Sequence, residues 1–200
     1  MSRLETAFRR LLDRLLVRGA RVAVVGGLAV SARTEPRFTR DADICVAVED
    51  DAEAEALIRG LQRQDFAVEA VVEQEATGRI ASARLVATRP SEAGVVLDLL
   101  FASSGIEADI VAGAETMELF EGLVAPIATV PALIALKVLA RDDARRPQDR
   151  VDLVSLLAVA NSADLAETRR LLALIEERGY ARGRRLLANL NALLDETLER

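Results

Sequence analysis

The chain has 200 residues, with no His, one Cys and a formal net charge of −6. This length suits one or at most two domains, and it buries a core without a disulfide or a structural metal. The missing residues exclude a Ser-His-Asp triad, a His general base, a His-ligated zinc site and an internal disulfide. The remaining chemistry is that of carboxylates, Lys, Arg, hydroxyl groups and Tyr, and carboxylates suit hard cations such as Mg²⁺.

No apolar run reaches the roughly 18 residues of a membrane span. Charges at Arg9, Arg10 and Asp13 interrupt the first twenty residues, which therefore do not resemble a signal peptide. We predict a cytoplasmic protein with no membrane partner. The acidic balance also argues against non-specific coating of nucleic acid.

Helical spacing of leucines, apolar runs and turn residues divide the first part of the chain into six segments. They are a helix over 3–18, a strand over 21–25 that ends at Gly26 and Gly27, a short helix over 28–33, a polar loop over 34–40, a strand over 41–48 and a helix over 50–64.

The rest of the chain reads as strands and then as helices. The predicted segments are strands over 66–73, 79–88 and 94–101, short strands around 109–112 and 123–128, and helices over 130–142, 148–160, 163–177 and 182–198. We therefore expect a mixed α/β (α+β) domain over 1–128 and a helical region over 129–200 that packs against it.

Three aspartates form a candidate metal site. Asp41 and Asp43 lie two apart on a predicted strand, so both carboxylates point to one face. Asp98 is a single charge inside the apolar run GVVLDLLF, and a buried carboxylate needs a partner such as a metal or an Arg. Three carboxylates on two strands suit Mg²⁺. The alternative is that the Asp pair is a turn feature and that Asp98 pairs with an Arg.

Gly26 and Gly27 join a predicted strand to a short helix, where backbone N–H groups can approach an anion closely. Taken alone, two glycines after a strand are typical of a simple turn. The residues between Gly27 and Asp41 are rich in groups that bind phosphate, which are Ser31, Arg33, Arg37, Thr39 and Arg40.

Together these residues resemble a known superfamily. The run VVGGLAVSARTEPRFTRDADICV is similar to the signature of the DNA polymerase β-type nucleotidyltransferases, and Asp98 in VVLDLL matches their third carboxylate. Within that superfamily the chain most resembles the AbiEii-like toxins of type IV toxin–antitoxin systems, through LIALKVLARDD and RPQDRVDL. The resemblance covers about residues 21–155. It implies a nucleotidyltransferase fold, with a mixed sheet flanked by helices and a helical segment at the C-terminal end.

The resemblance also implies roles for individual residues. Asp41, Asp43 and Asp98 would hold two Mg²⁺ or Mn²⁺ ions, and Asp98 would help to deprotonate the acceptor hydroxyl. The residues that would contact the NTP are Gly26 and Gly27 through their amides, the loop residues Arg37, Thr39 and Arg40, and Lys137, Asp149 and Asp152.

The late motif has a second interpretation. Asp149 and Asp152 are three apart on a predicted helix and share a face. They can instead pair in solvent with nearby arginines, which are Arg145, Arg146 and Arg150. Lys137, the one Lys of a chain with 25 Arg, can instead be a surface lysine of an apolar helix.

The leading hypothesis is a Mg²⁺-dependent transfer of a nucleoside monophosphate from an NTP to a hydroxyl, with tRNA as candidate acceptor and an antitoxin as candidate partner. Two alternatives stay open. One keeps the chemistry with an aminoglycoside-like small molecule or a protein hydroxyl as acceptor, and the other is a non-catalytic nucleotide- or antitoxin-binding module. The segment RGYARGRR, 178–185, either contacts a tRNA backbone or is a solvated connection between helices.

Overall fold

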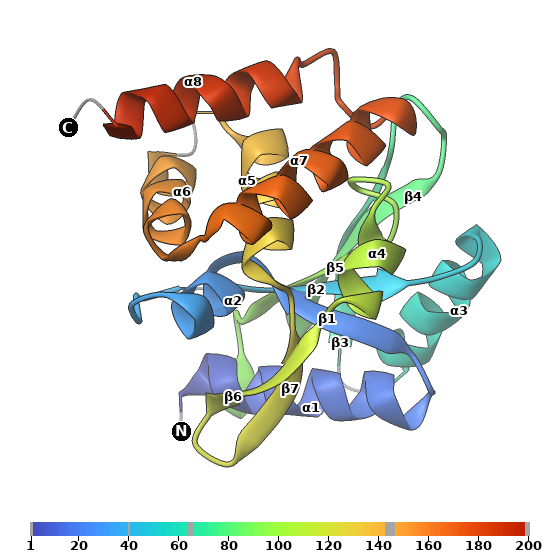
Figure 1. The fold of residues 1–200 in the computed structure, drawn as a ribbon. Coiled ribbons are helices and arrows are strands. Elements are labelled where there is room, and N and C mark those ends of the chain that lie inside the picture. Colours follow the sequence, from blue (N-terminus) through green and yellow to red (C-terminus); the bar gives the residue numbers. More distant parts are fainter. Residues whose placement is uncertain (1, 40, 64–65, 143–146, 199–200) are drawn as a thin grey trace.

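A computed structural model describes residues 2–39, 41–63, 66–142 and 147–198 (Figure 1). The helices are α1 (Arg3–Val17), α2 (Gly26–Arg33), α3 (Asp51–Gln62), α4 (Glu107–Ala112), α5 (Val130–Ala140), α6 (Pro147–Val159), α7 (Ser162–Glu177) and α8 (Leu186–Leu198). The strands are β1 (Arg21–Val25), β2 (Asp41–Ala47), β3 (Phe66–Glu73), β4 (Ile80–Ala87), β5 (Val96–Leu100), β6 (Glu115–Phe120) and β7 (Leu123–Ile127). The arrangement is the mixed α+β fold that the sequence predicts.

The strands form a single sheet in the order β3-β4-β5-β2-β1-β7-β6. The pairs β2–β5 and β1–β7 are parallel, and the others are antiparallel. The centre of the sheet is therefore β5, β2 and β1, which carry Asp98, Asp43 and the turn into Gly26. Register aligns Val25 with Asp43 and Asp43 with Asp98.

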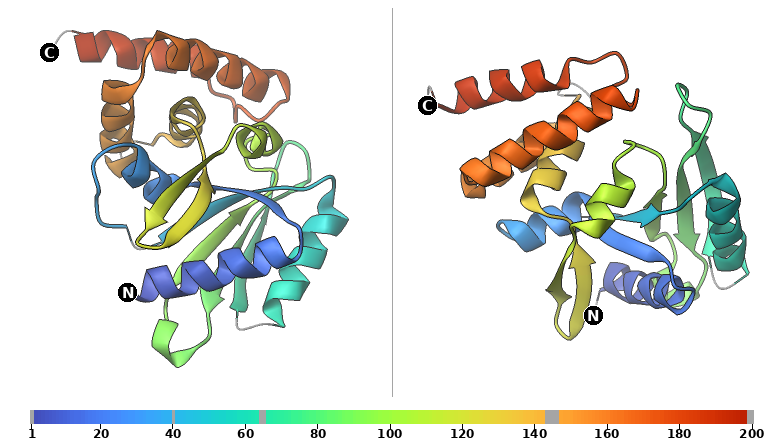
Figure 2. Two further views of the ribbon diagram at one scale, coloured as in Figure 1. Left: turned by 60° about the horizontal axis from the view of Figure 1, so that its bottom comes forward. Right: turned by 45° about the vertical axis from the view of Figure 1, so that its right-hand side comes forward.

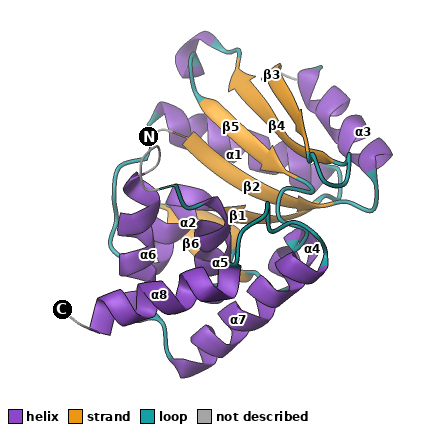
Figure 3. Ribbon diagram, turned by 90° about the horizontal axis from the view of Figure 1, so that it is seen from above, coloured by secondary structure: helices purple, strands orange, loops and turns teal. Residues whose placement is uncertain are grey.

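Helices cover both faces of this sheet. Helix α1 packs against β1 and β2 on the face away from α5–α8, and α3 packs against β3 and β4 (Figures 1 and 2). Helices α2 and α4 also contact β1 and β2. Helices α5, α6, α7 and α8 form one group next to α2, away from strands β3, β4 and β5 (Figure 3). The last strand ends at Ile127 and α5 begins at Val130, although the division into domains at residue 128 stays a prediction.

The sequence patterns explain which helix is central. Helix α1 is amphipathic, is capped by Ser2, and buries Phe8 with its ring edge-to-face on Phe120 at 6.2 Å. Helix α5 is apolar almost all round and buries residues on most of its sides. An apolar helix of this kind has to be surrounded, and α5 accordingly contacts α2, α6, α7 and α8. Lys137 is the exception within α5.

In part of the segment 104–129 the structure differs from the prediction made from the sequence. Residues 109–112, predicted as a strand, belong to helix α4, because a short apolar run does not separate the two periodicities. Glu107 in the first turn of α4 accepts hydrogen bonds from Ser103 and Ser104, which stabilises the start of the helix. Strand β6 was not predicted, and α2 begins at Gly26 rather than at residue 28.

Within the described part of the chain, no helix is long and apolar enough to span a bilayer.

Candidate active site

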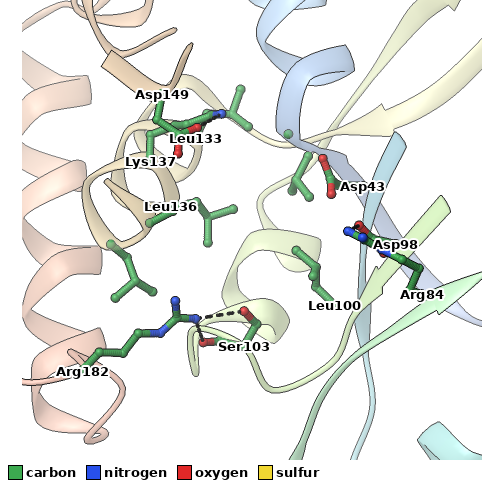
Figure 4. A pocket seen from close by; sticks show the side chains of 14 residues that line it. Asp43, Arg84, Asp98, Leu100, Ser103, Leu133, Leu136, Lys137, Asp149 and Arg182 are labelled. Atoms are coloured by element: carbon green, nitrogen blue, oxygen red, sulfur yellow. Dashed lines mark hydrogen bonds and ion pairs between the residues drawn. The ribbon is translucent and has the colours of Figure 1, made fainter. Parts of the chain in front are cut away.

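Strand register brings two of the predicted carboxylates together. Asp43 on β2 lies directly opposite Asp98 on the parallel strand β5, so both side chains leave the same face of the sheet. Both line one cavity of about 250 Å³ between the sheet and α5, which we call the Asp98 cavity (Figure 4). Asp41 stands at the exposed start of β2 and accepts a hydrogen bond from Thr39 at 3.2 Å.

Gly26 gives Asp43 the space it occupies. Gly26 has a φ of +63°, and a Cβ built on it would lie 1.8 Å from Oδ2 of Asp43. Any side chain at this position would therefore displace the carboxylate. Gly27 is constrained in a similar way, because its Cβ would lie 2.9 Å from both Arg37 and Thr39 Oγ1. The two glycines are required here by close approach, and not only by the turn.

Helix α2 starts at these glycines without a side-chain cap. The first N–H groups of a helix have no intrahelical partner and carry partial positive charge. Gly26 lines the Asp98 cavity, and Gly27 lines a second cavity of about 460 Å³, which we call the Arg37 cavity. The other residues that line the Arg37 cavity include Arg37, Phe38, Thr39, Asp41 and Gln148. Asp43, Lys137 and Asp149 line both cavities, so the two cavities are adjacent.

A buried charge network stands at this boundary. Lys137 Nζ lies 2.6 Å from Asp149 Oδ1 and 2.8 Å from Asp152 Oδ2. Arg37 binds Asp152 as well, with its terminal nitrogen 2.8 Å from Oδ2. The side chains of Lys137, Asp149 and Asp152 are 12%, 4% and 1% exposed. The two aspartates share a face of α6, as predicted, and they hold Lys137 and Arg37 beside the glycines.

This network bears on the solvent-pairing interpretation of the late motif, while the nucleotide-contact interpretation stays a prediction. Burial acts to raise the pKa of Asp152, but bonds from Lys137, Arg37 and Gln148 hold that pKa below its ordinary value. Asp149 and Asp152 are buried rather than solvated, and Arg150 pairs with Glu196 at 3.0 Å instead. The surface interpretation of Lys137 is wrong for the same reason. Arg40, Arg145 and Arg146 lie outside the described residues.

Asp98 has an Arg partner that the sequence did not single out. Arg84 on β4 lies opposite Asp98 in register and donates to both carboxylate oxygens, at 2.9 and 2.8 Å (Figure 4). This two-bond contact raises the pKa of Arg84. Arg84 is a single charge in the apolar run IASARLVA, so the argument applied to Asp98 also applied to its neighbouring strand. What the sequence lacked was the order of the strands.

Metal binding at these carboxylates stays a prediction. Among the residues that the structure describes, no three Asp, Glu or Cys side chains are gathered closely enough to form a metal cage. The donor chemistry nevertheless fits a hard cation, because the carboxylates of Asp43 and Asp98 line one cavity. Arg84 now occupies the oxygens of Asp98.

Two polar residues of α2, Ser31 and Arg33, serve the fold. Ser31 donates to Gly27 O at 3.0 Å, and Arg33 donates to Ala128 O and Ile127 O away from both cavities. Cys45, two residues beyond Asp43, is fully buried, and burial raises the pKa of its thiol. It is therefore not a candidate nucleophile.

Comparisons with known proteins identify a family and similar folds. The model of the family described as "Nucleotidyl transferase AbiEii toxin, Type IV TA system" matches residues 10–200. A search of curated proteins gave no match.

Solved structures of similar fold include an antigenic nucleotidyltransferase-like protein from Paracoccidioides brasiliensis. It is 19% identical with a TM-score of 0.55, and the match covers 96% of this chain and 92% of that one. Another is ANT(2")-Ia in complex with adenylyl-2"-tobramycin, which is 15% identical with a TM-score of 0.54 over 86% and 97% of the two chains. At these identities the likeness establishes the fold.

Proposed function

The chain belongs to the AbiEii family of nucleotidyltransferase toxins, and we propose on that premise that it transfers a nucleoside monophosphate from an NTP to a hydroxyl group of tRNA, with Mg²⁺. The observation that carries the proposal is the alignment of Asp43 with Asp98, next to a Gly26 that has no room for a side chain. We further propose that residues 1–128 form the catalytic domain and residues 129–200 a helical region that completes the site.

In this proposal the triphosphate occupies the Arg37 cavity. Backbone amides of Gly26 and Gly27 at the start of α2 bind its oxygens, since a helix N-terminus favours an anion. Lys137 and Arg37 add positive charge. Their side chains are held in position by ion pairs with Asp149 and Asp152. Thr39 and Arg40, from the loop after α2, are two further proposed contacts to the nucleotide. Asp149 and Asp152 thus act through Lys137 and Arg37 rather than on the nucleotide itself.

Asp41, Asp43 and Asp98 would hold the divalent cation, with Mg²⁺ as the first candidate and Mn²⁺ as the second. Such a cation, when bound by these carboxylates, would supply positive charge to offset the charge on the α-phosphate and on the leaving pyrophosphate. Asp43 and Asp98 also orient the acceptor hydroxyl, because both line the Asp98 cavity.

The reaction balances without a His. The acceptor hydroxyl gives its proton to a carboxylate oxygen of Asp98. The acceptor oxygen forms a bond to the α-phosphorus of the NTP, the bond between that phosphorus and the bridging oxygen breaks, and pyrophosphate leaves. Arg84, bonded to both oxygens of Asp98, has to release at least one of them for this step.

The toxin family implies a cognate antitoxin as partner, and we propose that this protein acts in the cytoplasm, where NTP and tRNA are present. The fold likeness to ANT(2")-Ia keeps a small-molecule acceptor among the outcomes of the test below. Transfer to a protein hydroxyl and a non-catalytic binding role are the remaining outcomes.

The test uses the full chain, Mg²⁺ and each α-labelled NTP in turn, with total tRNA, with tobramycin, or with the protein alone. We expect label in tRNA and release of pyrophosphate. Label in tobramycin or in the protein would move the acceptor to another class, and NTP binding without any transfer would contradict the proposal.

Variants Asp41→Ala and Asp43→Ala should each lower transfer by several orders of magnitude, because each removes a proposed cation ligand. Asp195→Asn on the exposed face of α8 is the matched control and should retain full activity. Turnover that survives both Asp→Ala changes would show that the site assignment is wrong.

A further inference from the structure

An exposed phenylalanine lies on the loop that leaves α2. The loop over 34–39 passes next to α6 (Figure 1), and Phe38 within it is 81% exposed. Among the described residues Phe38 is the one aromatic side chain that is exposed. It also lines the Arg37 cavity, in which we place the triphosphate. An aromatic ring is therefore present beside the proposed phosphate site.

The residues on both sides of Phe38 are fixed. Arg37 forms an ion pair with the buried Asp152 at 2.7 Å, and Thr39 Oγ1 donates to the first backbone carbonyl of β2 at 3.1 Å. The side chains of Arg37 and Thr39 both lie against Gly27, because an added Cβ there would be 2.9 Å from each of them. With both neighbours turned inward, the loop presents Phe38 outward on a fixed backbone. A ligand that meets this ring has little loop order left to impose, which favours binding.

We propose that Phe38 stacks on the base of the bound NTP and so holds that base at the side of the Arg37 cavity. This inference rests on the proposed function, because it takes the Arg37 cavity as the nucleotide site. Every nucleobase has a π-face that stacks on an aromatic ring, and the contact needs no hydrogen bond to a base edge. Phe38 therefore accepts any of the four bases. The contribution is larger for a purine, because its two rings cover more of the phenyl face.

The test separates the base from the phosphates. Isothermal titration calorimetry on the full chain with Mg²⁺ measures the affinity for ATP, for CTP and for inorganic tripolyphosphate, which has the charges of the NTP tail and no base. We expect Phe38→Ala to weaken ATP binding on the order of tenfold, as loss of a stacked base does. CTP should lose less. Tripolyphosphate should stay within about twofold of wild type, because it does not contact the ring.

Matched variants show whether the ring itself matters. Val17 at the end of α1 is an apolar side chain that is 84% exposed, and α1 covers the other face of the sheet. Val17→Ala should therefore leave all three affinities within about twofold, the range of ordinary surface substitutions. Phe38→Tyr keeps an aromatic face and should retain the affinity for ATP. Phe38→Leu keeps apolar bulk without a ring and should lose it as Phe38→Ala does.

A fluorescent variant reports the contact directly. The chain has no Trp, so Phe38→Trp introduces a single indole at this position. A base that stacks on the indole quenches its emission. We expect ATP to quench the emission of this variant, and tripolyphosphate at the same saturation to leave it unchanged.

Equal losses of ATP and tripolyphosphate binding in Phe38→Ala would overturn the proposal, because they would assign Phe38 a role in the shape of the phosphate site. Unchanged ATP affinity in Phe38→Ala would overturn it too and would leave the ring to another contact, such as a protein partner. Tripolyphosphate that binds the wild type as tightly as ATP would exclude stacking and leave the proposed phosphate site intact. ATP affinity that depends on Phe38, with no transfer to any acceptor in the wild type, would support stacking and contradict the proposed function.

Discussion

Two groups of charges flank the candidate site, and they are held in different ways. On the helical side, Asp149 and Asp152 bind Lys137 and Arg37 in a buried network. On the sheet side, Asp98 binds Arg84, which is 48% exposed. Burial makes the first network costly to break, whereas solvent makes the second pair easy to exchange. We infer that the helical side holds the charged side chains of Lys137 and Arg37 in fixed positions. On the sheet side, the carboxylate of Asp98 stays available for a metal ion or a proton.

The largest effect is expected from Asp152→Ala. This change leaves Lys137 and Arg37 with one fewer acid in a buried site, so the free energy of unfolding should fall by about 3 kcal/mol. Urea unfolding measures it, with exposed Asp195→Asn as the control. A loss below about 0.5 kcal/mol, the range of ordinary surface substitutions, would mean that the network is not the buried constraint described here.

Gly26→Ala tests whether the position of the Asp43 carboxylate depends on the space left by the missing side chain of Gly26. The new Cβ overlaps Asp43 and the φ is positive, so we expect a loss of about 2–3 kcal/mol in unfolding free energy and of nearly all transfer activity. Gly94→Ala is the matched control, because its φ is +82° with nothing near the added Cβ, and it should cost only about 1 kcal/mol. Equal effects in the two variants would remove the steric argument.

The pKa of Asp152 predicts how stability depends on pH. Its folded pKa lies below the ordinary value of about 3.9, so its contribution is complete above about pH 4 and is lost as the pH falls through the folded pKa. The stability difference between wild type and Asp152→Asn should therefore be the same at about pH 7 and pH 5 and smaller near pH 3. A difference that grows on acidification would contradict the sign of the shift.

The smallest effect on stability is expected from Arg84→Ala. Because the pair with Asp98 is partly exposed, unfolding free energy should fall by less than about 1 kcal/mol. The Mg²⁺ concentration that gives half-maximal transfer should also fall, since no guanidinium competes for Asp98. Urea unfolding and a Mg²⁺ titration measure the two effects. A stability loss as large as that of Asp152→Ala would remove the contrast between the two sides.

Local patterns determined much of the fold. The strand over 66–73 has the predicted bounds, and most predicted helices agree with the structure to within a few residues, because long periodic segments report their own conformation. Within 104–129 the strand around 123–128 is confirmed as β7, whereas 109–112 is helical and β6 was not predicted, since these apolar runs are too short to separate helix from strand. Spacing alone also predicted that Asp149 and Asp152 share a face of one helix.

The sequence by itself determined which chemistry is available: no His, three aspartates in strands, two glycines at a turn and a single Lys. Only the tertiary structure decided the partners, because a partner on another element depends on the order and register of strands and helices. Arg84 meets Asp98 because β4 pairs with β5, and Lys137 meets Asp152 because α5 packs on α6. Arg182 reaches the Asp98 cavity because the connection after α7 docks on the loop after β5. The spacing of residues along the chain does not predict these contacts between different elements.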